Sequence, residues 1–282
     1  MRSSLLAVIL ALLPTLALVQ GPPTYPPGEL ERLVSRIALY PDPLLAQVLA
    51  AATYPGDIPE AARWADQHHY LTGDALARTI EEDRLPWDPS VEALLPFPSV
   101  LSIMASDMRW TEELGNAFLS QPQEVMDAVQ RMRQRARDFG YLRSNGQIIV
   151  NNGPYIEILP ARADYIPVPY YDPGVIFLGP RRGVINFGFG VSIGPAYRPW
   201  GWGYNRMGWN NHTVIINNAP WGRTWGNRSG YAHNYRVERY VAPRPVERHD
   251  LRERSQRERQ EERSGRYREE HRGNGRGDDR RR

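Results

Sequence analysis

Two aspartates occupy equivalent points in two similar segments, and a pair of carboxylates is what a glycan-cleaving enzyme uses as general acid and base. Asp42 directly precedes Pro43, and Asp88 directly precedes Pro89. An aspartate in this position has a structural explanation, because its carboxylate caps free backbone N–H groups while the proline occupies the first helical position. We therefore predict that Asp42 and Asp88 cap helices, and we expect no catalytic residue. An enzyme would require two carboxylates that converge in a cleft.

The residue types give little support to metal or nucleophile chemistry. The chain has no Cys, and its 35 basic residues are all Arg. These counts exclude thiolate nucleophiles, Cys-ligated metals, disulfides and Schiff-base lysines. A zinc site needs histidines paired at helical spacing with a carboxylate nearby, and we find no such pairing among His68, His69, His212, His233, His249 and His271. We predict no metal site and no cofactor.

The residues best suited to binding are tryptophans and arginines in the C-terminal half. Five of the eight tryptophans lie within residues 200–225, interleaved with arginines. Aromatic rings stack on sugar faces or bases, and Arg pairs with phosphate or carboxylate. The simpler interpretation is that these tryptophans pack back on the helical domain or remain in an unfolded linker, and binding is the alternative to it. The candidate binding residues are Trp200, Trp202, Arg206, Trp209, Trp221, Arg223 and Trp225.

The last segment, residues 236–282, is a tract of Arg, Glu and Gln. It holds 16 Arg against 11 Asp and Glu, so the positive net charge of the chain belongs mostly to this tail. With almost no apolar residues, the tail is predicted to be disordered or partly helical. A basic tail suggests an anionic partner, whereas the mixing of Arg with acids also suits a solvated spacer.

The N-terminus is typical of a secretory signal peptide, predicted over residues 1–20. Its apolar stretch, from Leu5 to Val19, is shorter than the roughly 20 residues that a membrane-spanning helix needs. A Pro-rich linker over residues 21–28 follows in place of a cluster of charges. We expect cleavage and no stable membrane span in the mature protein; an uncleaved anchor is the alternative.

Short helices are expected to position Asp42 and Asp88. Leu30, Leu33, Val34 and Ile37 have the spacing of an amphipathic helix. A second helix is expected to start at Asp42, and together these segments predict a helical domain over residues 29–145. Further short helices are predicted at 59–65, 74–82, 89–95, 98–105, 111–119 and 122–139.

The signals change to β structure after Gln147. Two β-rich runs, 148–150 and 155–158, flank a turn and predict a hairpin, and further extended runs are predicted at 165–171 and 174–178. We assign a small β extension to residues 146–186 and a Gly/Trp-rich low-complexity segment, with too little aliphatic content for a core, to residues 187–235. The predicted fold class is mainly α: a bundle of short helices with a small β extension, then a disordered low-complexity C-terminal region. Residues 26–178 are expected to fold alone.

Several runs of residues, in this order and spacing, match a known family. They are Leu33 to Pro55, Glu60-Ala61-Ala62-Arg63-Trp64, Pro86-Trp87-Asp88-Pro89, Trp110-Thr111 and the closing Tyr165 to Pro173. The chain thereby resembles the bacterial domain-of-unknown-function family 3300. The resemblance implies a secreted or envelope-associated protein of Gram-negative bacteria with no established activity, so no catalytic residue is carried over. Pro169 departs from the usual closing motif and puts the pairing of that strand in doubt.

These observations predict an exported, non-enzymatic protein of the periplasm or cell envelope of a Gram-negative bacterium. We expect a scaffold or binding module whose low-complexity tail contacts an anionic envelope polymer, a membrane surface or an envelope protein. Nucleic acid is not an expected partner after export. The alternatives are a peptidoglycan- or glycan-acting enzyme and a protein-partner assembly factor, which would present an exposed apolar groove between helices.

Overall fold

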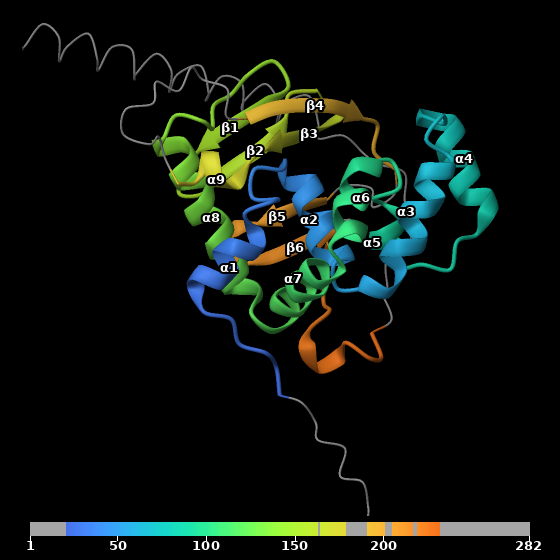
Figure 1. Cartoon of the computed structure of the whole chain (residues 1–282), viewed down its shortest axis with the longest axis horizontal. Helices are drawn as coiled ribbons and strands as arrows, with labels where there is room; N and C mark the ends of the chain where they lie inside the picture. Colours follow the sequence, from blue (N-terminus) through green and yellow to red (C-terminus); the bar gives the residue numbers. More distant parts are fainter. Residues whose placement is uncertain (1–20, 163, 179–190, 201–204, 217–218, 232–282) are drawn as a thin grey trace, which may run out of the picture.

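The computed structural model describes residues 21–162, 164–178, 191–200, 205–216 and 219–231 (Figure 1). Its first part is a bundle of short helices, which confirms the predicted helical domain. Proline opens most of them, in keeping with its fixed φ and missing N–H. The helices are α1 (Pro27–Val34), α2 (Asp42–Ala51), the 3-10 turn η1 (Pro55–Asp57), α3 (Ile58–Gln67), α4 (Gly73–Asp83), α5 (Pro89–Glu92), α6 (Pro98–Ser106), α7 (Met108–Ser120) and α8 (Pro122–Asp138).

Helix α2 lies at the centre of the core, and all ten of its residues are buried. It packs against α5, α7 and the strands that follow the helical domain. The contact with α7 depends on Gly115, because a Cβ there would collide with the carbonyl oxygen of Ala52. The run of Leu, Val and Ala in α2 is thus explained by burial on every side.

The two predicted aspartate caps have different outcomes. Asp88 caps α5 as predicted, since its Oδ1 accepts a hydrogen bond from the Ser90 backbone N at 2.9 Å. The prediction for Asp42 was wrong: Pro41 is the N-cap of α2, and Asp42 is the first helical residue with no side-chain cap bond. Its carboxylate turns instead to Arg133, a buried cation 91 positions further along the chain.

The predicted hairpin is confirmed as β1 (Ile148–Asn152) and β2 (Ile156–Pro160), paired antiparallel. Strand β3 (Ile166–Tyr171) pairs with β4 (Val191–Tyr197) despite Pro169, because the register shifts between Pro167 and Pro169. The extended run predicted at 174–178 was wrong. A short helix, α9 (Pro173–Ile176), forms there because Asp172 caps the backbone N–H of Gly174 at 2.8 Å.

The described part of the Gly/Trp-rich segment is folded onto the helices (Figure 1). Besides β4, it comprises β5 (Asn205–Gly208), the 3-10 turn η2 (Trp209–Asn211), β6 (Thr213–Ile216), β7 (Ala219–Pro220) and the turn η3 (Trp225–Asn227). The low aliphatic content of this segment did not keep these residues out of the core, and the interpretation that tryptophans pack back on the helical domain holds for Trp200, Trp209 and Trp221. A few large side chains are enough to extend a core when they pack on an apolar surface that the helices already provide. Six residues of this segment belong to the central core: Trp200, Met207, Trp209, Val214, Ile216 and Trp221.

The mainly α fold class with small antiparallel strands is confirmed. The predicted signal peptide at 1–20 and the tail at 236–282 lie outside the described residues. Across the described ranges, no helix is both long enough and apolar enough to cross a bilayer.

Candidate functional site

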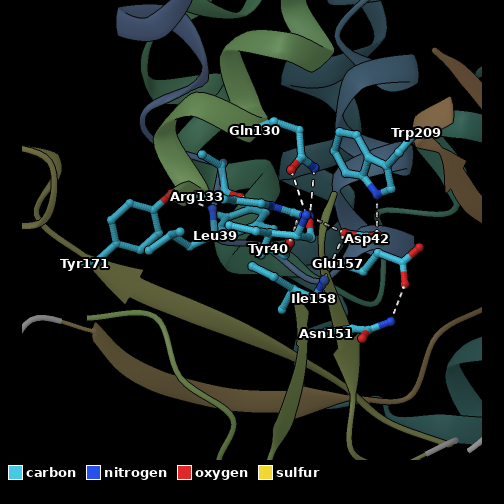
Figure 2. Close-up of polar contacts among 12 residues, drawn as sticks. Leu39, Tyr40, Asp42, Gln130, Arg133, Asn151, Glu157, Ile158, Tyr171 and Trp209 are labelled. Atoms are coloured by element: carbon cyan, nitrogen blue, oxygen red, sulfur yellow. Dashed lines mark hydrogen bonds and ion pairs between the residues drawn. The ribbon is translucent and has the colours of Figure 1, made fainter. Parts of the chain in front are cut away.

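Arg133 is completely buried, although it sits on the apolar face of α8. Its Nη1 donates to the Asp42 carboxylate at 2.6 Å and to the Ile156 carbonyl at 2.8 Å. Its Nε and Nη2 donate to the carbonyls of Ala38 and Tyr40 at 2.8 and 2.9 Å (Figure 2). These bonds provide the compensation that a charge removed from water requires.

The Asp42 carboxylate is satisfied from three elements at once. Oδ1 also accepts the backbone N–H of Ile158 in β2 at 3.3 Å, and Oδ2 accepts the indole N–H of Trp209 at 2.8 Å (Figure 2). The guanidinium carbon of Arg133 lies 4.9 Å from the Trp209 ring centroid, in cation–π contact. Asp42, Arg133 and Trp209, which we call the buried triad, therefore fix α2, α8, β2 and η2 relative to one another. Both oxygens of Asp42 are occupied, which leaves it unsuited to proton transfer with a substrate.

Trp209 also lines a surface hollow of about 610 Å³ between the β1–β2 hairpin and the β5–η2 segment, which we call the Glu157 hollow. Six of its twelve lining residues are polar or charged: three asparagines, a tyrosine, one glutamate and one arginine. The lining residues are Asn151, Gly153, Pro154, Tyr155, Glu157, Arg206, Met207, Gly208, Trp209, Asn210, Asn211 and Ile215.

Glu157 is half-buried in this hollow and accepts a hydrogen bond from Asn151 Nδ2 at 3.1 Å (Figure 2). Burial raises the pKa of Glu157, and the negative charge of Asp42 raises it further. The Asn151 hydrogen bond and the cations Arg133 and Arg206 oppose this rise. Glu157 thus offers two carboxylate oxygens as hydrogen-bond acceptors near the cation Arg206. This arrangement suits ligand binding better than acid–base catalysis, which needs a second carboxylate.

A second polar cluster lies at the end of α2. The Asp88 backbone N–H donates to Asp57 Oδ2 at 3.3 Å, and the guanidinium carbon of Arg223 lies 3.7 Å from the ring centroid of Tyr54. Burial, and then the charge of Asp88, raises the pKa of Glu92 to about 7; burial also raises the pKa of Asp57. The carboxylates of Asp57 and Glu92 both lie close enough to Asp88 for its charge to raise their pKa, and the Arg223 guanidinium lies near Asp57.

The structure brings three of the predicted binding residues, Arg206, Trp209 and Arg223, to these two places. Arg206 and Trp209 meet in the Glu157 hollow. Trp221 stacks on Phe118 with ring centroids 5.5 Å apart. The guanidinium carbon of Arg228 lies 3.9 Å from the Trp225 ring centroid. Arg223 covers Tyr54, Trp200 is buried, and Trp202 lies outside the described residues.

Of the described histidines, His68 and His69 are adjacent and line one hollow, whereas His212 lies beside Asp127. His68 stacks on Trp64 with ring centroids 4.0 Å apart, and Nε2 of His212 lies 3.0 Å from Asp127 Oδ1. Within the described ranges, no group of three or more His, Asp or Glu side chains is arranged to hold a metal ion.

Sequence reasoning missed four residues of the site: Arg133, Asn151, Tyr155 and Glu157. One signal was present, because Arg133 interrupts the apolar face formed by Val129 and Ala136, and a lone charge on such a face needs a buried partner. The other three belong to a hairpin that the sequence did predict. Their meeting with Arg206 depends on how β5 and η2 fold back, which no local pattern specifies.

Comparison with known proteins places the chain in a family. The family described as protein of unknown function, DUF3300, matches residues 26–263. The uncharacterized protein YacH of Escherichia coli strain K12 is 33% identical over 64% of this chain. That alignment covers 38% of YacH, so the chain spans well under half of the length of this relative. No solved structure matches. Because the match extends over most of the chain, from α1 past η3, the chain belongs to the DUF3300 family.

Proposed function

We propose that this protein is an exported, non-enzymatic binding module of the Gram-negative cell envelope, and that the Glu157 hollow binds a glycan. The observation that carries the proposal is the lining of the hollow, where amides, Tyr155, Glu157 and Arg206 face one space. Amides and carboxylates pair with hydroxyl groups, and an aromatic ring packs against the apolar face of a sugar. A site for an apolar small molecule would have a mainly hydrophobic lining instead.

The buried triad supports the same proposal. Trp209 belongs both to the triad and to the wall of the hollow, and Glu157 lies between two residues of β2 whose backbones bond to the triad, Ile156 and Ile158. Both walls are therefore held before any ligand arrives. A preformed wall lowers the entropy lost on binding, which suits a module that binds without chemistry.

The envelope location rests on the sequence. The apolar stretch of residues 5–19 has the length and context of a secretory signal, and the absence of Cys is compatible with an exported chain that needs no disulfides. In that compartment, glycans are abundant ligands. The basic tail of residues 236–282 would add a second, electrostatic contact with anionic polymer or membrane surface.

The two alternatives have less support in the structure. Among the described residues that line the hollow, Glu157 is the one carboxylate, so an acid–base pair is missing there. A glycan-acting enzyme would have to use Glu92 and Asp88, and Asp88 Oδ1 is already bonded to the backbone N and Oγ of Ser90. An assembly factor calls for an apolar groove between helices. The large apolar side chains exposed in the described part of the chain all lie outside α1–α8: Tyr70, Phe139, Tyr170, Val175 and Leu178.

The test is binding of the mature protein to purified peptidoglycan sacculi and to soluble envelope glycans, measured by co-sedimentation and calorimetry. Glu157→Gln removes the charged acceptor, and the affinity should fall about tenfold. Glu82→Gln is the matched control, because Glu82 is exposed on α4, and α4 lies apart from the β1–β2 hairpin in Figure 1. Absence of binding by the wild type, or equal binding by the two variants, would refute the proposal. Release of soluble sugar from sacculi that is lost in Glu92→Gln would favour the enzyme.

A further inference from the structure

A second hollow, of about 520 Å³, lies on the other side of the β1–β2 hairpin tip, against the C-terminal half of α8. Gly153, Pro154 and Tyr155 line both hollows. The hairpin tip therefore separates the two hollows, and the half-buried Tyr155 lines both of them. We call the second space the Arg137 hollow.

The Arg137 hollow differs from the Glu157 hollow in charge. Arg131, Arg135 and Arg137 of α8 line it, together with Asp138. Arg131 and Arg135 share one carboxylate, that of Glu31, at 2.7 and 3.2 Å. The side chains of the two arginines are 42% and 39% exposed, against 21% for Glu31. Arg137 lies 3.6 Å from Asp138, and their side chains are 36% and 57% exposed. Three arginines against the two carboxylates of Glu31 and Asp138 leave an excess of one positive charge at this hollow.

The ridge between the hollows is low. Gly153 is exposed and has no side chain, and a Cβ built on it would meet only the Tyr155 carbonyl oxygen, at 3.8 Å. An extended chain that fills one hollow can therefore continue into the other without a conformational change. Because φ at Gly153 is not positive, a larger residue fits there without backbone strain and would raise the ridge.

We propose that the ligand is an extended glycan strand bearing carboxylate or phosphate groups, which runs from the Glu157 hollow across Gly153 into the Arg137 hollow. This inference rests on the proposed glycan binding and specifies its substrate class. The uncharged lining and Tyr155 hold sugar units, while the arginines of α8 pair with the anionic substituents. Two envelope polymers carry this chemistry: peptidoglycan strands whose stem peptides have been removed, which leaves free lactyl carboxylates, and the phosphorylated core of lipopolysaccharide.

The first experiment places a larger side chain at Gly153, between the two hollows. Gly153→Glu places bulk and negative charge between the hollows, and Gly56→Glu makes the same change at another exposed glycine with open space around it. The probes are long glycan strands released from sacculi by an amidase, delipidated lipopolysaccharide core, and a single disaccharide unit, each titrated by NMR, which registers weak binding. Gly153→Glu should weaken strand binding about tenfold and change disaccharide binding less than about twofold. Gly56→Glu should change neither.

The second experiment removes the charge. Arg137→Gln and Arg131→Gln should each weaken strand binding about three- to fivefold at low salt, and high salt should erase the difference from wild type, because exposed ion pairs are weak and screened. Arg78→Gln is the matched control, since Arg78 is exposed on α4 at the opposite end of Figure 1 from the hairpin. Whichever of the two polymers binds more tightly identifies the source of the anionic groups.

The results distinguish binding of an anionic strand across Gly153 from glycan binding in the Glu157 hollow alone. Disaccharide binding as tight as strand binding, or a Gly153→Glu variant that behaves like Gly56→Glu, would overturn the shared path while leaving the Glu157 hollow as a glycan site. Arginine variants that bind like Arg78→Gln would overturn the anionic class. A wild type that binds neither strands nor disaccharide would refute the proposed function itself.

Discussion

Arg133 and Asp42 form an ion pair with 2.6 Å between Nη1 and Oδ1, and the two side chains are 0% and 4% exposed. The pair joins α8 to the start of α2 and, through Ile158 and Trp209, reaches β2 and η2. A buried pair of this kind is stable because each guanidinium nitrogen of Arg133 and both carboxylate oxygens of Asp42 have a hydrogen-bond partner. The wall of the Glu157 hollow therefore depends on residues that are distant in the sequence.

Breaking the pair should be costly. Arg133→Met leaves the Asp42 carboxylate buried without its cation, and we expect the free energy of unfolding to fall by about 3–5 kcal/mol. Asp42→Asn should cost a similar amount, and the double variant should cost clearly less than the two single losses combined. Chemical denaturation of the four proteins gives this cycle. Additive losses would show that the two side chains act independently.

Removal of the C-terminal segment should also destabilise the helical domain. A chain that ends at Leu178 lacks Trp209, whose indole N–H satisfies Asp42, and Asn205, whose Nδ2 donates to the Pro43 carbonyl at 2.9 Å. The structure thus changes our expectation that residues 26–178 fold alone. We expect residues 26–231 to unfold cooperatively and residues 26–178 to lose stability or cooperativity, as followed by circular dichroism during denaturation. Equal midpoints would restore the earlier boundary.

The contrast between these two regions shows what the sequence can and cannot predict. The helices and the β1–β2 hairpin follow from local signals, such as proline at a helix start and apolar residues at regular spacing, and these were predicted at nearly the right positions. Asp42 has the same local signals as Asp88, yet only Asp88 caps its helix, because Arg133 competes for Asp42 from α8. Local sequence carries no information on such a competitor.

The candidate site depends on the same kind of long-range contact. Trp209 and Arg206 were identified by residue type, but their neighbours Asn151 and Glu157 come from a hairpin more than 45 positions earlier in the chain. Composition also misled us about residues 191–231, where a few large apolar side chains complete a core that the helices begin. The average aliphatic content of a segment does not reveal the contribution of a few large side chains.

Close packing between α2 and α7 gives a prediction about Gly115. A methyl group at this position would collide with the Ala52 carbonyl oxygen, so Gly115→Ala should lower the free energy of unfolding by about 1–3 kcal/mol. Gly28→Ala in α1 is the control, because a Cβ there meets nothing within 4 Å; it should be neutral or gain up to about 1 kcal/mol. Thermal or urea denaturation measures both. A Gly115→Ala variant as stable as Gly28→Ala would contradict the close approach.

Glu92 should make stability depend on pH. Its pKa is raised from 4.5 to about 7 in the folded protein by burial and by Asp88, so the folded state holds the proton more tightly than the unfolded chain. The contribution of Glu92 to stability is therefore fully present below pH 4.5 and is lost as the pH rises towards 7. In Glu92→Gln this loss should disappear, so the variant should gain on the wild type over that interval in urea denaturation. Parallel pH profiles would show that Glu92 titrates normally.

The position of the glycan on the protein is the most direct test of the proposed binding site. Backbone amide signals of the isotopically labelled protein can be followed by NMR while peptidoglycan glycan strands are added. We expect the shifts to concentrate at the hairpin tip and η2, at Gly153, Tyr155, Asn210 and Asn211, and to leave α4 unchanged. Shifts confined to η3 and the surroundings of Arg223, or no shifts at any strand concentration, would contradict a glycan site in the Glu157 hollow.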